Sequence, residues 1–179
     1  HDPNVVHRES SFFSDIRRSI PREVVGSIGL SVYSPDQLAK ALRIPEISAV
    51  QIPVNIADGR FPESLLLRAS KENVRVYARS IFLQGALLQE REKLPNHLAP
   101  LGDLTDSLRQ LALDTGTSVA EICMAWVKTR PGISGLVVGA ETVAQVQELK
   151  SAFDKCGSHP FDFGPMKALQ SVAPEVVDP

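Results

Sequence analysis

Residues 74–88 read VRVYARSIFLQGALL, and this stretch decides the fold class. It begins with the β-branched and aromatic residues Val74, Val76 and Tyr77, a composition that favours a strand in a buried parallel sheet. The polar pair Arg79–Ser80 and an apolar loop follow. Because α/β folds place their chemistry at the carboxyl ends of parallel strands, we expect a functional site here.

Three further apolar runs predict strands on either side of this one. VVGSIGLSV (24–32) reads as a strand buried on both faces, AVQIPV (49–54) as a second and GLVVG (135–139) as the last. Helical patterns separate the runs, so strand and helix alternate. Parallel α/β is therefore the predicted fold class, and both an open doubly wound sheet and a (β/α) barrel satisfy this alternation.

Capping residues predict where the helices begin. Ser34 stands before a proline and three residues before Gln37, the pattern of a capping box, and the pairs Ser118 with Glu121 and Thr142 with Gln145 repeat it. The predicted helices cover residues 9–20, 34–42, 62–71, 104–115, 119–129, 142–153 and a short segment near 165–172, with a turn at 58–60 and a polar surface excursion at 89–100.

The composition is that of a soluble globular domain. The chain has 179 residues, of which 43% are hydrophobic and 22% charged, with a net charge of -2. No basic excess indicates a nucleic-acid partner, and no apolar run approaches the roughly 20 residues of a membrane span. We therefore expect a single domain over residues 1–179 with neither nucleic acid nor membrane as partner.

The two cysteines indicate a reducing compartment. Cys123 and Cys156 lie far apart without metal-ligand spacing, and Cys123 belongs to an apolar helical pattern, as does Trp126. We expect Cys123 and Trp126 to lie in the core. We also expect a cytoplasmic location for the protein. The sequence opens at HDPNVV without a Met or a signal-like start, which we interpret as a cut end.

Polar residues follow the predicted strands. They are His1, if HDP closes a strand, and then Ser31, Gln51, Asn55, Arg79, Ser80 and the segment Gly139–Thr142. In that segment a glycine precedes a Thr-capped helix, whose free backbone N–H groups suit an anion. An ordinary helix cap explains the same residues, and the sequence leaves both interpretations open. Residues 90–93 read as a solvated charge cluster, and His97 and His159 lie in loops without metal-ligand partners.

Five segments in order resemble the aldo-keto reductases: HDP, IGLSVYS, AVQIPVN, VYARSIFLQGALL and GLVVGAETVAQVQEL. The fourth resembles a bacterial branch that writes this loop as ARS-x-FLQG. The resemblance covers strands four to eight of that family's barrel. It implies a parallel (β/α) TIM-type barrel of which this chain is the C-terminal half, and an NAD(P)H-dependent reduction of an aldehyde or ketone to an alcohol.

The resemblance also implies roles for individual residues. His1 matches the histidine that orients the substrate carbonyl, and Ser31 and Gln51 match residues that hold the nicotinamide carboxamide. Val32 stands where the family usually has an asparagine, and Arg79 where many members stack a tyrosine on the nicotinamide ring. The implied cofactor-binding residues are Ser31, Val32, Gln51, Arg79, Ser80, Gly139, Ala140, Glu141, Thr142, Gln145 and Glu148.

Two departures from the family pattern matter. Members that prefer NADP usually carry basic residues in the last segment, whereas this chain has Val138, Ala140, Glu141 and Gln145, so NADP(H) and NAD(H) both remain open. The family's proton-donating tyrosine, with its lysine and aspartate, belongs to the first barrel half. Neither Tyr33 nor Tyr77 matches it, and general acid catalysis needs such a donor near the alkoxide.

These departures leave alternatives. The chain is either part of a reductase of small carbonyl substrates or a non-catalytic nicotinamide-nucleotide-binding or interaction module derived from the family, and an interaction protein without a ligand is a third reading. A half-barrel exposes two strand edges and an apolar interior. We expect these to be covered either by an N-terminal barrel half upstream or by a homo-oligomer.

Overall fold

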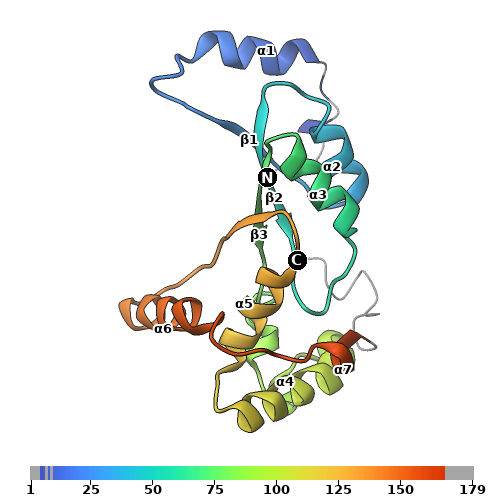
Figure 1. The fold of residues 1–179 in the computed structure, drawn as a ribbon, viewed down its shortest axis with the longest axis vertical. Coiled ribbons are helices and arrows are strands. Elements are labelled where there is room, and N and C mark those ends of the chain that lie inside the picture. The colour runs from blue at the N-terminus through green and yellow to red at the C-terminus, as the bar shows by residue number, and fades with distance from the viewer. Residues whose placement is uncertain (1–4, 7, 9, 168–179) are drawn as a thin grey trace. The chain divides into compact units, whose positions relative to one another are not determined.

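The computed structural model describes residues 5, 6, 8 and 10–167. The chain divides into two compact units. A sheet unit comprises the residues up to Pro53, Arg60–Arg79 and Arg130–Leu136, and a helical unit comprises Val54–Gly59, Ser80–Thr129 and the residues from Val137 on. Figure 1 labels the elements of both.

The sheet unit contains four parallel strands in the order β1-β2-β3-β4. They are β1 (Ile28–Ser31), β2 (Ile47–Pro53), β3 (Arg75–Arg79) and β4 (Ile133–Leu136). The predicted parallel α/β class is confirmed. A doubly wound sheet reverses its strand order at a switch point, and these four strands follow one another without reversal. The order is that of part of a (β/α) barrel.

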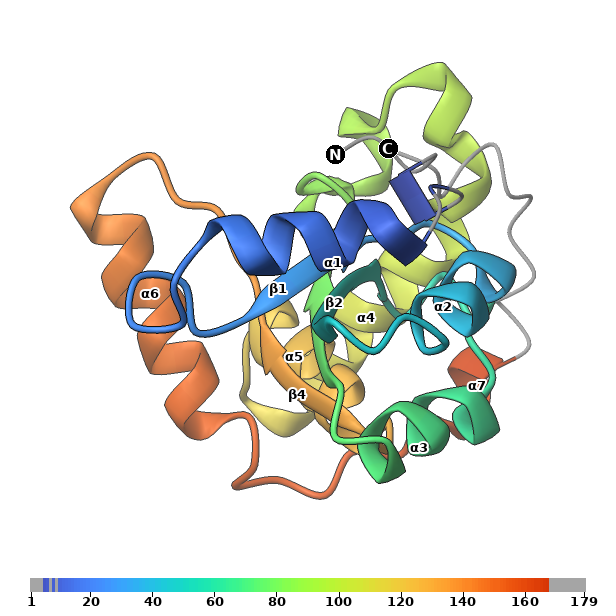
Figure 2. The same cartoon turned by 90° about the horizontal axis from the view of Figure 1, so that it is seen from above.

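Three helices accompany the strands: α1 (Ser10–Ser19), α2 (Pro35–Ala41) and α3 (Glu63–Lys71). Ser34 caps α2 as predicted, since its Oγ accepts a hydrogen bond from Gln37 N at 3.2 Å. The Gln37 side chain reaches one residue further back than a capping box requires, because its Oε1 accepts from Tyr33 N at 2.7 Å. Helices α2 and α3 lie on the same side of the strands (Figure 2).

The two faces of the sheet differ in burial. Val50, Ile52, Val76 and Ala78 are at most 1% exposed, and their strands β2 and β3 contact α2 and α3 respectively. On the opposite face the register row Ser31, Gln51, Tyr77 and Gly135 is only partly buried. The expectation that β1 is buried on both faces is wrong, because β1 is an edge strand of this sheet with a mostly half-exposed pattern.

The last strand begins earlier than predicted. Strand β4 covers Ile133–Leu136 rather than residues 135–139, and Val137 and Val138 are 40% and 39% exposed. Apolar content alone does not determine which residues of this run pair with β3. The register is fixed by pairing of Gly135 with Tyr77 and by Gly132, whose φ of +81° turns the chain against the Leu66 carbonyl.

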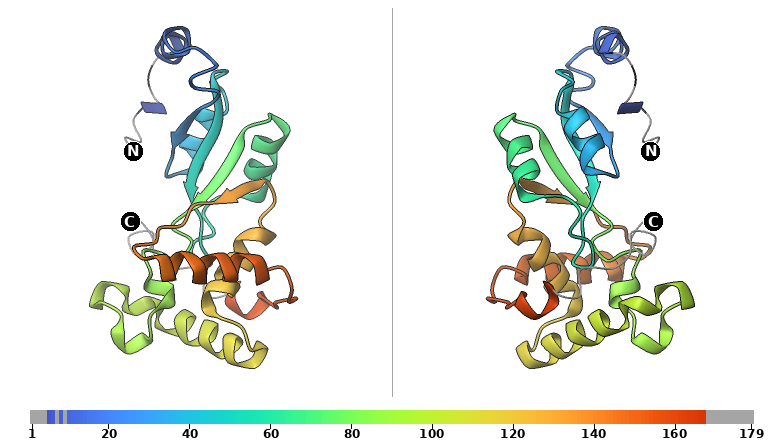
Figure 3. Two further views of the ribbon diagram at one scale, coloured as in Figure 1. Left: turned by 90° about the vertical axis from the view of Figure 1, so that its left-hand side faces the viewer. Right: turned by 90° about the vertical axis from the view of Figure 1, so that its right-hand side faces the viewer.

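The helical unit is built around four α-helices and short 3-10 turns, coloured from yellow-green to red in Figure 3. The elements are η2 (Ala86–Leu88), η3 (Arg91–Lys93), η4 (Asn96–Leu101), α4 (Gly102–Thr115), α5 (Val119–Thr129), α6 (Val143–Lys155) and α7 (Gly164–Lys167). Its core includes Leu104, Leu108 and Ile122, and Cys123 and Trp126 are buried as predicted. The predicted short helix near 165–172 is observed only to Lys167, and its remainder lies outside the described residues.

The polar excursion at 89–100 is largely exposed, as expected, and carries η3 and part of η4. Arg91 forms ion pairs with Asp103 and Asp106, which raise the pKa of its guanidinium. Among the described helices none is both long and apolar enough to cross a membrane. The same residues contain no cluster of His, Cys, Asp and Glu arranged to hold a metal ion.

Candidate functional site

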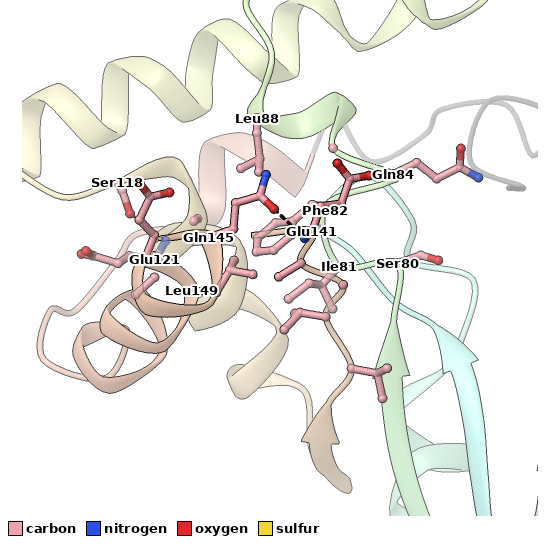
Figure 4. Close-up of a pocket in the computed structure, with 18 of the residues that line it drawn as sticks. Ser80, Ile81, Phe82, Gln84, Leu88, Ser118, Glu121, Glu141, Gln145 and Leu149 are labelled. Atoms are coloured by element: carbon pink, nitrogen blue, oxygen red, sulfur yellow. Dashed lines mark hydrogen bonds between the residues drawn. The ribbon is translucent and has the colours of Figure 1, made fainter. Parts of the chain in front are cut away.

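A pocket of about 1130 Å³ lies within the helical unit. Four segments line it: the loop after β3, the start of α5, the segment after β4, and α6 (Figure 4). The lining residues are Ser80, Ile81, Phe82, Gln84, Gly85, Leu88, Gln89, Ser118, Ala120, Glu121, Val137, Val138, Gly139, Ala140, Glu141, Gln145, Glu148, Leu149, Ser151 and Ala152. The predicted site at the end of the 74–88 stretch thus contributes to a real concavity.

The loop after β3 has an unusual backbone. Ser80, Leu83 and Gln84 have φ values of 55°, 47° and 53°, and Gly85 has a φ of 89°. Non-glycine residues seldom adopt this left-handed region, and strain of this kind gathers at ligand sites. The loop is held by hydrogen bonds from Leu83 N to Ser80 O at 2.9 Å and from Gly85 N to Phe82 O at 2.9 Å.

Asn55 supports the start of this loop rather than acting as an exposed site residue. It is fully buried, and its Nδ2 donates to Ser80 O at 3.3 Å while its Oδ1 accepts from Ala57 N at 3.0 Å. The turn predicted at 58–60 falls at residues 55–58, where Asp58 N donates to Asn55 O at 3.0 Å. An amide side chain forms this turn because it can satisfy the nearby backbone.

The start of α6 is a complete capping box, as predicted. Thr142 Oγ1 accepts from Gln145 N at 3.2 Å, and Gln145 Oε1 accepts from the backbone N–H groups of Glu141 at 2.7 Å and Thr142 at 3.2 Å. The Gln145–Glu141 bond is drawn in Figure 4. Helix geometry leaves the N–H groups of Val143 and Ala144 without acceptors inside the helix. The ordinary cap is therefore observed, and Val143 and Ala144 are not among the residues that line the pocket.

The strand ends of the sheet unit gather the predicted carboxamide residues. Ser31 and Gln51 are register partners at the end of β1 and in β2. Ser31 Oγ is buried and has no hydrogen-bond partner among the described residues. The Val32 side chain is 1% exposed and apolar, and its backbone N donates to Gln51 O at 2.9 Å. A side-chain hydrogen bond from position 32 is thus excluded.

Arg79 is stacked on a protein ring. Its guanidinium carbon lies 4.4 Å from the centroid of the Tyr33 ring. The carbonyl oxygen of Tyr33 in turn accepts a hydrogen bond from Arg60 Nη1 at 3.4 Å. The resemblance places Arg79 at a nicotinamide-stacking position, and in the structure its guanidinium already lies over a tyrosine.

The structure separates the predicted site residues into two groups. Ser80, Gly139, Ala140, Glu141, Gln145 and Glu148 line the pocket, and Thr142 caps the adjacent helix without lining it. Ser31, Val32, Gln51 and Arg79 belong to the sheet unit, and His1 lies outside the described residues. Sequence reasoning missed Phe82, Gln84, Ser118 and Glu121 as lining residues. The capping pair Ser118–Glu121 signals a helix start, but only tertiary packing brings that start beside the loop.

The comparisons with known proteins agree with this geometry. A model of the Aldo/keto reductase family matches residues 24–163. An aldo-keto reductase from Bacillus halodurans, in its holo form, superposes with a TM-score of 0.66 at 20% identity over 94% of this chain and 58% of that chain. Its apo form gives the same TM-score over 59% of that chain.

Relatives by sequence are named as oxidoreductases. An uncharacterized oxidoreductase of Mycobacterium tuberculosis (strain ATCC 25618 / H37Rv) is 29% identical over 171 residues, covering 86% of this chain and 52% of the relative. One from Mycobacterium bovis gives the same values. The chain thus spans about half the length of the curated relatives it matches. Because the family model matches most of its residues, the chain belongs to the aldo/keto reductase family.

Proposed function

We propose that this chain supplies the nicotinamide-nucleotide-binding half of an oxidoreductase that reduces an aldehyde or ketone to an alcohol. The observation that carries the proposal is the pocket of the helical unit. Its walls include the loop 80–89 and the segment 137–152, and both overlap segments that resemble the family. The family match over residues 24–163 supports it.

The pocket suits the adenosine end of a dinucleotide. Phe82, Leu88, Val137 and Leu149 provide apolar surface for a base, while Ser118 and Gln89 add polar groups. Ligand sites commonly combine an apolar lining with a few polar groups in this way. The start of the 13-residue helix α6 offers backbone N–H groups to a phosphate.

The strand ends suit the nicotinamide end. Ser31 Oγ is a buried hydroxyl without a partner among the described residues, and Gln51 is its neighbour in register. A carboxamide presents both a donor and an acceptor, which a hydroxyl and an amide side chain can satisfy. We assign carboxamide binding to Ser31 and Gln51, with Val32 contributing only its apolar side chain.

The chemistry divides between cofactor and protein. When bound, the reduced nicotinamide supplies the hydride. His1 is assigned to the carbonyl oxygen, where an imidazole N–H would donate a hydrogen bond and polarise the carbonyl. Ser31 and Gln51 would fix the orientation of the ring. The proton for the alkoxide comes from the tyrosine of a first barrel half, which we place outside the 179 residues.

A non-catalytic nucleotide-binding module is the second candidate. The tyrosines of this chain favour it for the 179 residues alone, because the Tyr33 ring lies under Arg79 and Tyr77 stands within β3. The ring of Tyr77 also occupies the space above Gly135, where an added Cβ would lie 3.1 Å from its Cδ1. Neither residue matches the position of the family's donor in the resemblance.

Binding and turnover distinguish the two candidates. The protein as its source organism makes it, including any residues that precede or follow the 179, is titrated with NADH and NADPH by calorimetry and then assayed for oxidation of the bound nucleotide by a small aromatic aldehyde. Binding with turnover supports the reductase, and binding without turnover supports the module. Binding of neither nucleotide would contradict both.

A pair of variants localises the binding. Gln51→Ala should weaken nucleotide affinity about fivefold, the value of one net hydrogen bond of about 1 kcal/mol. Gln110→Ala makes the same change on the exposed surface of α4, where its side chain donates to Asp114, and should leave affinity unchanged. Equal affinities of the two variants would remove Gln51 from the site.

We also propose that β1 and β4 pair with further strands, because each lies at an edge of the described sheet. Either an upstream barrel half of the same polypeptide or a second copy would supply them. Light scattering on the 179-residue chain measures the second. Cys123 and Cys156 are free and buried, which fits the cytoplasm as the proposed compartment.

A further inference from the structure

The charged residues that line the pocket all carry one sign. Glu121, Glu141 and Glu148 are among its lining residues, and no Lys, Arg or His side chain of the described residues is. Their carboxylates make no hydrogen bond or ion pair with another described residue. They are thus available as acceptors for a ligand.

Five basic side chains of the helical unit have partners other than a pocket ligand. Arg91 is held by two aspartates, and Arg109 donates to the carbonyl oxygen of Leu88 at 2.8 Å without lining the pocket itself. Lys93 pairs with Glu90, Lys150 pairs with Asp154, and Lys128 contacts the Phe153 ring and carbonyl oxygen. Lys155 does not line the pocket. Within the part of the chain that the structure describes, none of these is placed to meet a phosphate in the pocket.

We propose that this pocket selects NAD(H) over NADP(H) and that Glu141 is the residue that determines the choice. The inference rests on the proposed function, since it presumes that the pocket holds adenosine. NADP(H) differs from NAD(H) by a phosphate in place of the ribose 2′-hydroxyl. A carboxylate accepts a hydrogen bond from that hydroxyl, whereas it repels a phosphate.

Glu141 is singled out by its position. It lies between Gly139 and the α6 cap, and its backbone N is fixed by the Gln145 side chain at 2.7 Å (Figure 4). The residue therefore stands just before the start of α6 and lines the pocket. Glu121 and Glu148 lie on α5 and α6 and add to the negative field.

Two pairs of ligands isolate the effect of the 2′-phosphate on binding affinity. Calorimetry compares NADH with NADPH, and 5′-AMP with adenosine 2′,5′-bisphosphate, each at about 20 mM and about 300 mM salt. We expect the ligand without the 2′-phosphate to bind about tenfold more tightly at low salt. The ratio should shrink at high salt, because screening weakens the repulsion.

Three variants test the residue. Glu141→Gln removes the charge and should reduce the preference severalfold, while Glu141→Lys should abolish or reverse it. Glu92→Lys makes the same change in net charge at an exposed residue that does not line the pocket, and it should keep the wild-type ratio. Glu141 is exposed, so circular dichroism should show all three folded.

The outcomes separate this inference from the proposed function. Equal binding of NADH and NADPH, or tighter NADPH binding, would overturn the inference and leave the proposed function standing. A preference that survives both Glu141 substitutions would overturn the assignment to this residue. If the wild-type chain bound no nucleotide at all, the proposed function and the inference would fall together.

Discussion

The guanidinium of Arg79 lies over the ring of Tyr33, with 4.4 Å between its central carbon and the ring centroid. The contact joins the end of β3 to the residue two places after β1, two strands that do not pair with each other. A cation over an aromatic face gains electrostatic energy from the ring quadrupole, more so when it is shielded from water. Both side chains are partly buried.

Replacing the ring should therefore destabilise the sheet unit. Tyr33→Leu is expected to lower the free energy of unfolding by about 1 kcal/mol, which corresponds to roughly 2–4 °C in Tm for a chain of this size. Tyr33→Phe keeps the ring and should stay within about 0.5 kcal/mol of wild type. Thermal unfolding followed by circular dichroism measures both. Equal losses in the two variants would mean that the hydroxyl, and not the ring, carries the stability.

Ser31 is expected to contribute to ligand binding rather than to the stability of the fold. Its Oγ is buried without a partner among the described residues, a state that costs folding energy. Ser31→Ala is therefore expected to leave the free energy of unfolding unchanged or raise it by about 1 kcal/mol, while weakening NADH binding severalfold. Urea unfolding and calorimetric titration provide the two values.

Ser134→Ala is the matched control for Ser31→Ala. Ser134 Oγ accepts a hydrogen bond from Val76 N at 3.1 Å, so its removal should lower stability by about 1 kcal/mol without changing NADH affinity. A clear loss of stability in Ser31→Ala would show that the hydroxyl has a structural partner and would remove the argument for a ligand there.

Local signals predicted much of the fold. The capping residues Ser34, Ser118 and Thr142 each stand one residue before the helix they predicted, because a cap is a contact between residues three apart. The apolar run at 135–139 predicted the last strand with the wrong bounds, because its register depends on Tyr77, which is distant in sequence. Pairing with distant strands decides such strand boundaries, and local composition contains no information about that pairing.

The sequence likewise predicted those residues of the candidate site that lie in one continuous segment, and it missed those brought together by packing. Glu141 and Gln145 were found because they lie in one continuous segment after a strand. Glu121 was missed as a lining residue because its place depends on how α5 packs against α6, which no local pattern states. Arg79 was assigned to a ligand ring, yet the chain itself supplies Tyr33 for it to cover.

Gly132 should tolerate no side chain. Its φ is +81°, and an added Cβ would lie 2.4 Å from the carbonyl oxygen of Leu66 in α3. Gly132→Ala is expected to cost about 3 kcal/mol or more, because backbone strain and a steric clash act together. Denaturant unfolding of the soluble fraction gives the value.

Gly116→Ala separates strain from clash. Gly116 has a φ of +65° at the end of α4, and an added Cβ would meet nothing within 4 Å. This variant should lose only about 1 kcal/mol, the cost of a left-handed conformation for alanine. Equal losses at the two glycines would show that α3 moves away from Gly132 at little cost.

Burial of Cys123 should make stability depend on alkaline pH. Desolvation raises the pKa of its thiol from 9.0 to about 12 in the folded protein. Above pH about 9 the unfolded chain loses this proton while the folded chain keeps it, so the contribution of the thiol to stability falls as pH rises from 9 toward 12, by up to about 1.4 kcal/mol per pH unit. Urea unfolding at pH 8 and pH 10 measures the change. Cys123→Ala lacks this titration, so it should lose less stability than wild type between the two pH values, even though it is less stable at pH 8 because of the cavity. Parallel losses in the two proteins would mean that the thiol ionises equally well in the folded and unfolded chains, and its burial would then have no part in the alkaline transition.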